Sequence, residues 1–361
     1  MSYILSSGIQ VAEHSYSQSK VKSLIKELFP LKPHEINRLL PVFEHANIEE
    51  RQFAMDLEWF QSEHGLSERN QIYHEKAIEY AKDAINTCLS NTTFLKREVH
   101  SSEVDHVIFV SSTGISTPTI DAYLINEMKM KDSVKRTPIF GLGCAGGTSG
   151  VAKSYEYLKG HPEENVLIVC VELCSLTFQH NDPRVSNFVG TALFGDGASA
   201  VLMIGEKSPL RDLGQTSLIE VSSSSSRIKP DSTDVMGWRV VDSGFEVIFN
   251  KSIPRLVKDF WYNHMRDVLQ ERGVEVQQLP FIIAHPGGRK VLEGYQEVFN
   301  LPEKTLEFSR DVLRKHGNMS SPTVHFVLNE AMKSKPAAGT KSFMTSLGPG
   351  FSSEIVSLEW M

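Results

Sequence analysis

The stretch TPIFGLGCAGGTSGVAKSYEYL, residues 137–158, sets one cysteine between an apolar run and a run with helical periodicity. We expect a strand that ends at Phe140, a helix that begins near Thr148, and Cys144 on the turn between them. Glycines at 141, 143, 146 and 147 permit positive φ angles and close approach of another segment. The free N–H groups and positive dipole end at the start of a helix favour a thiolate, so this turn suits a nucleophile. A small cysteine that only packs in the core is the alternative for this residue taken alone.

The segments on both sides of this turn alternate between strand-like and helix-like patterns. Short apolar, β-branched runs that end in glycine or polar turns occupy residues 106–114, 137–143, 165–173 and 197–205. Helix-like pieces separate these runs, and residues 18–100 have mainly the three- and four-residue apolar spacing of charged helices. This alternation predicts an α/β protein in which helices cover both faces of a mixed sheet.

The second half of the chain repeats the style of the first half. Residues 279–288 form an apolar run that ends in a glycine-bearing turn before a helix-like run, and residues 341–360 form two strand-like runs around Gly-Pro-Gly. The serine-rich stretch 221–234 is typical of a polar surface loop between the halves. We therefore divide the chain into residues 1–221, which carry Cys144, and residues 222–361.

The totals narrow the possible functions. The chain has 361 residues with 44 acidic and 37 basic side chains, and its net charge of −7 argues against a general nucleic-acid or anionic-membrane binder. The four cysteines form no CxxC pair and no zinc-type array with histidine, so we expect neither a disulfide framework nor a metal site. Without a leader-like start or an apolar run of membrane length, a cytoplasmic protein with no membrane insertion is expected.

Two further turns offer partners for a reactive thiol. His285 follows the apolar run FIIA and precedes Pro-Gly-Gly, which places it at the equivalent turn of the second half. Asn318, in HGNMSSPT, lies on a third turn, where Ser320 or Ser321 could cap the next helix; an ordinary left-handed turn residue is its alternative. An imidazole and an amide are the groups that would hold a thiolate and stabilise charge on a carbonyl oxygen.

With these three turns in place, the chain resembles the thiolase-fold condensing enzymes, and among them the type III polyketide synthases of the chalcone-synthase-like family, in a bacterial alkylpyrone-synthase-like form. The resemblance covers nearly the whole chain and rests on five motifs in order. They are GLGCAGG (141–147), GTALFGDGASA (190–200), AHPGG (284–288), HGNMSSPT (316–323) and LGPGFSSE (347–354). It implies a thiolase-like, duplicated αβαβα layered architecture with mixed central sheets, and a homodimer.

The resemblance also implies roles for single residues. Cys144 would carry the acyl group, His285 would be its ion-pair partner, and Asn318 would bind the thioester carbonyl with His285. Phe194 matches the aromatic gatekeeper between the coenzyme A tunnel and the reaction cavity. The other positions that match the substrate site are Thr177, Cys174, Ser320, Val247, where plant members have a second gatekeeper phenylalanine, and Thr117, where they have a methionine that crosses the dimer interface.

These roles imply a complete reaction with acyl-CoA and malonyl-CoA as substrates and no metal or redox cofactor. The starter acyl group would load onto Cys144, malonyl-CoA would extend it by decarboxylative condensation, and cyclisation would follow. Because valine at 247 is smaller than phenylalanine, we expect room for medium- or long-chain fatty acyl starters and alkylpyrone products, with alkylresorcinols as a further outcome. The alternatives are a ketoacyl-ACP synthase III-like enzyme, a cysteine hydrolase of thioesters and a binding protein without catalysis.

Overall fold

The computed structural model describes residues 1–29 and 31–361. The strands are β1 Ser2–Val11, β2 His14–Ser17, β3 Glu50–Phe53, β4 His106–Val110, β5 Lys135–Ile139, β6 Asn165–Leu173, β7 Asp196–Gly205, β8 Ile219–Ile228, β9 Met236–Val241, β10 Gly244–Phe249, β11 Ile283–Ala284, β12 Lys341–Gly348 and β13 Ser352–Trp360. The helices are α1 Gln18–Leu28, α2 Pro33–Leu39, α3 Pro41–His45, α4 Leu66–Leu89, α5 Ile120–Glu127, α6 Gly146–Gly160, α7 Val185–Leu193, α8 Ile253–Leu256, α9 Tyr262–Arg272, α10 Arg289–Phe299, α11 Glu307–His316 and α12 Thr323–Lys333.

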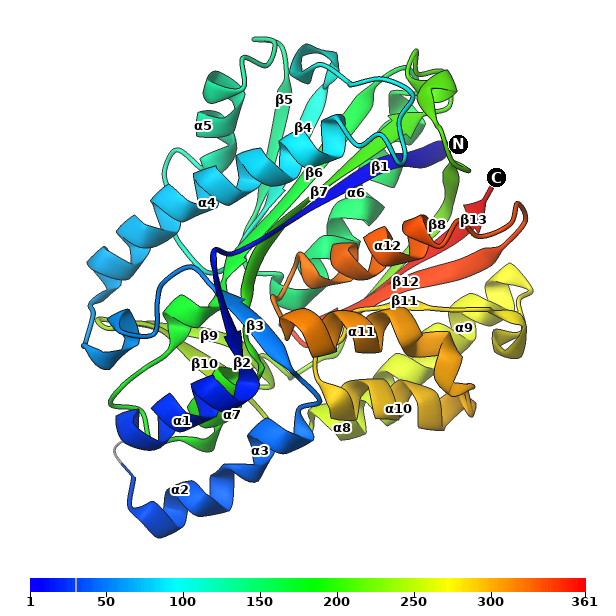
Figure 1. The fold of residues 1–361 in the computed structure, drawn as a ribbon. Coiled ribbons are helices and arrows are strands. Elements are labelled where there is room, and N and C mark those ends of the chain that lie inside the picture. Colours follow the sequence, from blue (N-terminus) through cyan, green and yellow to red (C-terminus); the bar gives the residue numbers. More distant parts are fainter. Residues whose placement is uncertain (30) are drawn as a thin grey trace.

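One mixed sheet of nine strands organises the chain, in the order β11-β12-β13-β8-β1-β7-β6-β4-β5 (Figure 1). In the first half β4 is parallel to β6, which pairs antiparallel with β7, and β7 pairs antiparallel with β1. The second half repeats this pattern, because β11 is parallel to β12 and then β13 and β8 follow antiparallel. Strands β1 and β8 join the two repeats. The duplication expected from the sequence is confirmed.

Three hydrophobic cores separate the layers of helices and strands. Helix α4 shares the first core with β6 and β7, and Figure 1 shows it lying across these strands. Helices α6 and α12 share the second core with strands of both halves, so they form the middle layer. Helices α9 and α10 share the third core with β12 and β13. The chain therefore has the thiolase-like αβαβα layering that the sequence predicted.

The interpretation of 221–234 as a surface loop is wrong for residues 221–228. These residues belong to β8, which lies inside the sheet between β13 and β1. The serine hydroxyls find partners there: Ser223 Oγ donates to Ser357 Oγ at 2.7 Å, and Ser226 Oγ donates to Glu354 at 2.6 Å. Ser225 Oγ lies 2.9 Å from Nε2 of His264 on α9. A polar run can thus form an interior strand when each hydroxyl is hydrogen-bonded. The boundary placed between 221 and 222 falls within this strand, and the division itself stays a prediction.

Two smaller expectations also change. The mainly helical region 18–100 is interrupted by β3, which pairs antiparallel with β2. The strand expected to reach Phe140 ends at Ile139, and a 3₁₀ turn at Gly143–Ala145 leads directly into α6 at Gly146, earlier than Thr148. The nucleophile candidate therefore lies on a tighter turn than the sequence suggested.

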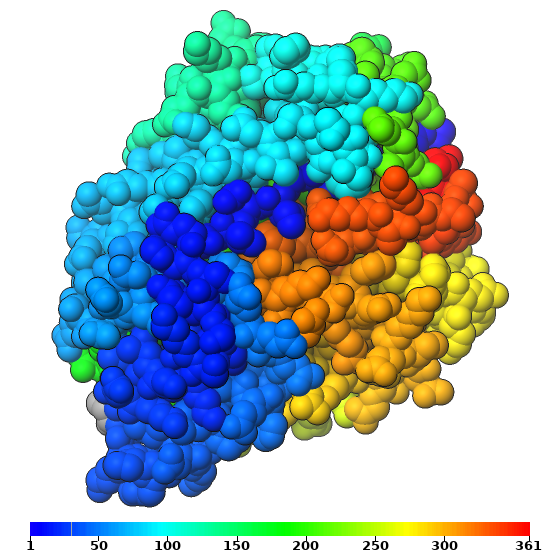
Figure 2. Space-filling view, viewed as in Figure 1, coloured from blue at the N-terminus to red at the C-terminus, as the bar shows by residue number. Residues whose placement is uncertain are grey.

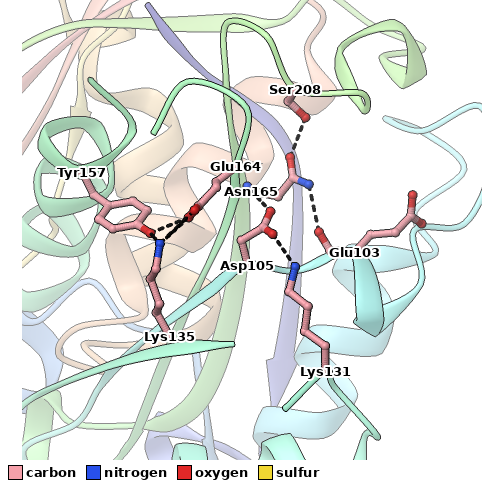
Figure 3. A network of polar contacts seen from close by, with 8 residues as sticks. All are labelled: Glu103, Asp105, Lys131, Lys135, Tyr157, Glu164, Asn165 and Ser208. Atoms are coloured by element: carbon pink, nitrogen blue, oxygen red, sulfur yellow. Dashed lines mark hydrogen bonds and ion pairs between the residues drawn. The ribbon is translucent and has the colours of Figure 1, made fainter. Parts of the chain in front are cut away.

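The amino ends of β4, β5 and β6 are held by a polar network (Figure 3). The Asp105 carboxylate accepts a bond from the backbone N–H of Asn165 at 2.7 Å and pairs with Lys131. Lys135 donates to Glu164 at 2.8 Å, and Asn165 Nδ2 donates to the carbonyl of Glu103 at 2.8 Å. These contacts fasten the starts of three neighbouring strands.

The remaining elements form a lobe at one end of the layered core. Helices α1 and α3 contact α7, which in turn packs against β10. Figure 2 shows the blue surface of α1 to α3 as a projection at the lower left of the molecule. Among residues 1–29 and 31–361, no helix is both long and apolar enough to cross a membrane.

Candidate active site

Cys144 lies on a turn that only glycine-rich sequence can form. Gly143 has φ +48°, and a Cβ there would also lie 3.0 Å from Cδ of Pro349. A Cβ on Gly147 would lie 2.3 Å from the carbonyl oxygen of Ser321, so α6 packs there directly on backbone. The Gly143 N–H donates to Ser112 Oγ at 3.1 Å and fixes the turn against the end of β4. The turn holds Cys144 at 7% exposure.

Asn318 lies on the turn between α11 and α12, where its backbone pairs with the segment after α7. Its N–H donates to the carbonyl of Leu193 at 2.9 Å, and its carbonyl accepts from the N–H of Gly195 at 3.1 Å. The side-chain Oδ1 accepts from the N–H of Ser320 at 2.8 Å, and Nδ2 donates to the carbonyl of Gly287 at 3.2 Å. These bonds leave the amide beside the nucleophile, with Cys144 Sγ 3.9 Å from Oδ1 and 4.0 Å from Nδ2.

His285 follows β11 and is buried at the same place. Its N–H donates to the carbonyl of Thr345 at 2.8 Å, which extends the pairing of β11 with β12 by one residue. Neither ring nitrogen has a hydrogen-bond partner among the described residues. The ring lines the same cleft as Cys144 and Asn318, so the structure brings together the three residues that the sequence singled out. A buried imidazole with both nitrogens available can exchange a proton with a ligand.

Burial dominates the electrostatics of these residues. It raises the pKa of the Cys144 thiol to about 11 and lowers the pKa of His285 to about 3. Behind them, burial raises the pKa of Glu172 to about 7, although this carboxylate accepts bonds from the N–H of Ser112, from Thr113 Oγ1 and from Ser321 Oγ. Desolvation therefore opposes the thiolate that the helix start was expected to favour. The ion pair of Cys144 with His285 stays a prediction.

The cleft that opens from Cys144 has a volume of about 860 Å³ and a cationic rim. The basic side chains that line it are Arg38, Lys251, Arg289 and Lys290, together with His45, and the described lining contains no Asp or Glu. The rim suits a ligand with several negative charges. Sequence analysis missed these residues because they come from three distant segments, and only Lys251 and the Arg289–Lys290 pair stood near a motif.

The inner side of the nucleophile is closely packed. Phe194, Val247 and Cys174 form a buried cluster with Trp238 and Phe249. The ring centroid of Phe194 lies 5.4 Å from that of Trp238 and 5.5 Å from that of Phe249. Free space beside Cys144 and Ser320 is only about 20 Å³. The room expected from valine at 247 is therefore taken up by Trp238 and Phe249.

A second, largely apolar pocket with a volume of about 30 Å³ begins on the far side of this cluster, and Arg51 is among its lining residues. It shares Phe194 and Val247 with the space beside Cys144 and also contains Cys174 and Thr177. The hydrophobic residues of its walls are Val21, Leu24 and Ile25 of α1 together with Phe53, Leu57, Phe60 and Phe178. Thr117 is exposed on the loop between β4 and α5 and lines none of these spaces. Its expected place at the substrate site would require a second copy of the chain and stays a prediction.

Three chain turns that deliver a thiol, an imidazole and an amide to one cleft, on a duplicated αβαβα fold, are the hallmark of the thiolase-fold condensing enzymes. Within that class, residues 57–207 match the family described as "Chalcone and stilbene synthases, N-terminal domain", and residues 220–359 match its C-terminal domain. The chain belongs to the chalcone and stilbene synthase family, the type III polyketide synthases.

Individual relatives agree with this assignment. A Bacillus subtilis (strain 168) protein, provisionally named chalcone synthase, is 38% identical over 361 residues, which cover 100% of this chain and 99% of that protein. The 1,3,6,8-tetrahydroxynaphthalene synthase of Streptomyces peucetius subsp. caesius is 34% identical over 96% of this chain and 90% of that protein.

Solved structures match the fold over almost the whole chain. The 1,3,6,8-tetrahydroxynaphthalene synthase of Streptomyces coelicolor A3(2) has a TM-score of 0.89 at 24% identity and covers 100% of this chain and 99% of that chain. The C-terminal type III polyketide synthase domain of "Steely1" from Dictyostelium has a TM-score of 0.90 at 24% identity, with 99% of both chains covered. At this identity the likeness shows the fold.

Proposed function

We propose that this polyketide synthase loads a medium- or long-chain fatty acyl group from coenzyme A onto Cys144, extends it with malonyl-CoA and cyclises it to an alkylpyrone. The convergence of Cys144, His285 and Asn318 on one cleft supports the first two steps. The apolar side chains that line the pocket behind Phe194 and Val247 carry the choice of starter. Because the free volume of this pocket is only about 30 Å³, the packed cluster of Phe194, Trp238 and Phe249 must shift to admit an alkyl chain. Alkylresorcinols are a further product of the same chain if cyclisation takes another route.

The loading step begins from the neutral pair that burial favours. As Cys144 Sγ attacks the thioester carbonyl, its proton moves to a ring nitrogen of His285, whose nitrogens have no other partner among the described residues. The imidazolium then faces the developing oxyanion. When the carbon–sulfur bond of the thioester breaks, coenzyme A leaves as a thiol with the proton from His285, and the acyl group stays on Sγ.

The extension step uses the same two polar groups. Malonyl-CoA loses its carboxylate as carbon dioxide, and the electron pair of the broken carbon–carbon bond forms an enolate on the thioester. A ring N–H of His285 and Nδ2–H of Asn318 would donate to the enolate oxygen, where one donor is worth roughly 10²–10³ in rate. The enolate carbon attacks the acyl-Cys144 carbonyl, and Sγ leaves as a thiolate. Decarboxylation supplies the carbanion, so the proposed steps need no metal or redox cofactor.

The cationic rim supports coenzyme A as the carrier. Phosphate groups are bound by arginine and lysine, and Arg38, Lys251, Arg289 and Lys290 line the outer cleft. Arg289 is also paired with Glu293, which lies outside the cleft lining. Since Cys144 is at the inner end, a coenzyme A thioester would enter with its phosphates at the rim and its thioester at the thiol. This arrangement favours coenzyme A thioesters over free acids as substrates.

The starter is tested with saturated acyl-CoAs of graded length, coumaroyl-CoA and malonyl-CoA, with products identified by mass spectrometry. We expect alkylpyrones and a rate that rises with chain length, because a longer alkyl chain buries more area against the α1 side of the pocket. A preference for coumaroyl-CoA, or a rate that falls beyond short acyl chains, would contradict the fatty acyl starter without affecting the assignment to the family.

A homodimer is proposed from the free edge of the sheet. Strand β5 is the edge strand, Phe140 directly after it is 62% exposed, and Ile115 on the neighbouring loop is 48% exposed. Strand β5 itself carries Lys135, Arg136 and Pro138, which oppose strand pairing. The exposed side chains of Phe140 and Ile115 are therefore the surface that a second copy would cover. Sedimentation analysis should give a dimer for the native chain and a monomer for Phe140→Asp. A native chain that sediments as a monomer would contradict the proposal. The cytoplasmic address expected from the sequence stays a prediction.

A further inference from the structure

Arg51 is a fully buried arginine with an unusual set of partners. It lies on β3 and is 0% exposed. Its Nη1 donates to the carbonyl of Thr191 at 2.6 Å and to the carbonyl of Phe194 at 2.8 Å. Its guanidinium carbon lies 5.2 Å from the ring centroid of Phe53. The two carbonyls belong to the last turn of α7 and its C-cap, so Arg51 places a positive charge at the negative end of that helix.

This burial is costly for the fold. Desolvation lowers the pKa of Arg51 to about 9, against the attraction of the nearby Asp196, so the side chain stays charged at neutral pH. Its Nε and Nη2 have no partner among the described residues. Asp196, whose charge acts on Arg51, accepts hydrogen bonds from the backbone N–H groups of Ala54 and Ser175 instead. A hydrophobic side chain of similar volume would avoid this cost. The arginine therefore calls for a role beyond stability.

The carbonyls that Arg51 holds lead directly to the proposed enolate site. Residues 193–195 form the backbone pairs with Asn318, through the Leu193 carbonyl and the Gly195 N–H. The stem of Arg51 also packs against the residue before Asn318, because a Cβ on Gly317 would lie 2.9 Å from Cδ of Arg51. The arginine thus contacts both chain segments that meet here, the one that carries the Phe194 ring and the one that carries the Asn318 amide.

We propose that Arg51 is a positioning residue that holds the Asn318 amide and the Phe194 ring in place for the decarboxylation of malonyl-CoA. It acts through the end of α7 and does not touch the substrate's reacting atoms. The proposal rests on the role of Asn318 given under the proposed function. Cys144 and His285 are held by other segments, after β5 and after β11, and Arg51 contacts neither of these segments in the described bonds.

Because Arg51 contacts the Asn318 segment and not those of Cys144 and His285, its substitution should affect decarboxylation of malonyl-CoA but not the reactivity of Cys144. In Arg51→Met, alkylation of Cys144 by iodoacetamide between pH 6 and 10 should keep its pH profile and stay within about two-fold in rate. Release of carbon dioxide from malonyl-CoA should fall at least about ten-fold, since one misplaced oxyanion donor costs roughly 10²–10³. Arg51→Lys keeps the charge but not the guanidinium that spans two carbonyls, so it should fall between Met and the native residue.

Two control variants separate this role from general damage. Arg69 is also a buried arginine that donates to backbone carbonyls, of Leu176 at 2.6 Å and of His64 at 2.9 Å, but it does not contact the Asn318 turn. Arg69→Met should keep decarboxylation within about three-fold at a similar loss of thermal stability. If Arg69→Met lowers decarboxylation as much as Arg51→Met, or if both half-reactions of Arg51→Met fall together, the positioning role is wrong.

The variant Asn318→Ala separates a failure of the inference about Arg51 from a failure of the proposed function of Asn318. This variant should lose decarboxylation by roughly 10²–10³ while Cys144 alkylation continues. If it decarboxylates normally, the proposed function of Asn318 fails, whatever Arg51 does. If Asn318→Ala is impaired but Arg51→Lys decarboxylates at the native rate, and Arg51→Met either does so too or does not fold, the inference about Arg51 is wrong. The proposed function of Asn318 then stands.

Discussion

The two ends of the parallel strands β4 and β6, with their neighbour β5, are built on opposite principles. At the amino ends, Asp105, Lys135, Glu164 and Asn165 each have hydrogen-bonded or charged partners (Figure 3). At the carboxyl ends, Cys144 and Glu172 are buried with pKa values raised by desolvation. Satisfied polar groups stabilise a fold, whereas desolvated groups with shifted pKa values are what chemistry requires. One end fastens the strands and the other holds the reactive groups.

The second repeat follows the same division. Its counterpart strand β11 delivers His285, whose ring nitrogens have no partner among the described residues. The Asn318 turn adds Gly317 at φ +67° and Ser320 at φ +58°, a conformation that is unfavourable for serine. The fold therefore tolerates strain and desolvation at the candidate active site, and the cores and the amino-end contacts supply the stability that allows it.

The largest expected effect is a loss of activity without a loss of stability, from a substitution at the carboxyl ends of the strands. Cys144→Ala removes the nucleophile, so polyketide formation should fall by at least about 10³-fold. The free energy of unfolding, measured by urea titration, should change by no more than about 1 kcal/mol, because only one sulfur atom leaves a cleft wall. Product formation at a tenth of the native rate would show that another residue carries the acyl chain.

A substitution at the amino ends of the strands should lower stability without lowering activity. Asp105→Ala leaves the buried N–H of Asn165 without its carboxylate partner, which should lower the free energy of unfolding by about 2 to 3 kcal/mol. At 25 °C the folded variant should keep its kcat, because Asp105 and its partners Lys131 and Asn165 lie at the amino ends of the strands, whereas Cys144 follows the carboxyl end of β5. Lys153→Met, which removes an exposed i,i+3 pair with Glu156, serves as the control and should cost less than about 0.5 kcal/mol. A loss of kcat in Asp105→Ala at unchanged stability would contradict the division between the two ends.

The sequence predicted the carboxyl end better than its surroundings, for a physical reason. Cys144 and His285 follow apolar runs and sit among glycines, and those patterns are local, so each turn could be recognised without knowledge of its neighbours. The serine run of β8 could not, because the partners of its hydroxyls, Ser357, His264 and Glu354, come from distant segments. Tertiary contacts there override the local preference of serine for loops.

The space around position 247 likewise depends on residues from other segments. Val247 indicated extra space only if its surroundings stayed the same, and Trp238 on the paired strand β9 fills that space instead. The cationic rim combines Arg38, Lys251 and the Arg289–Lys290 pair, none of which is informative without the others. Cavity shape depends on how distant side chains pack, so it requires the structure.

The pH dependence of the unfolding free energy tests whether burial also shifts the pKa of His325, which lies close to the Cys144 turn. His325 is buried under α6, with Nε2 3.0 Å from the carbonyl of Gly147 and Nδ1 2.9 Å from Ser199 Oγ. Burial lowers its pKa to about 4, below the roughly 6.5 of an unfolded histidine, so the unfolded state takes up a proton first as the pH falls. This contribution is complete above about pH 6.5 and is lost toward pH 4.

The variant His325→Gln lacks this titration. The difference in unfolding free energy between the native chain and the variant should therefore shrink by about 2 kcal/mol from pH 7.5 to pH 5, measured by urea titration at both values. His100→Gln, at an exposed position, is the matched control. A difference that stays constant over this range would mean that folding does not shift the pKa of His325, and a difference that grows toward pH 5 would mean that His325 is protonated in the fold.

The smallest expected effect concerns the side chains that separate the space beside Cys144 from the apolar pocket. Val247→Phe adds a ring to a cluster already filled by Trp238 and Phe249, so passage of an alkyl chain past Phe194 should become harder. We expect kcat/KM for a long-chain acyl-CoA to fall about ten-fold relative to a short-chain one, equivalent to about 1.4 kcal/mol. Ile248→Phe changes the next residue of β10, whose side chain points to the opposite face, and should leave that ratio unchanged. If Val247→Phe and Ile248→Phe shift the ratio equally, the substitutions act by loosening the β9–β10 strand pair, and the alkyl chain does not pass Val247.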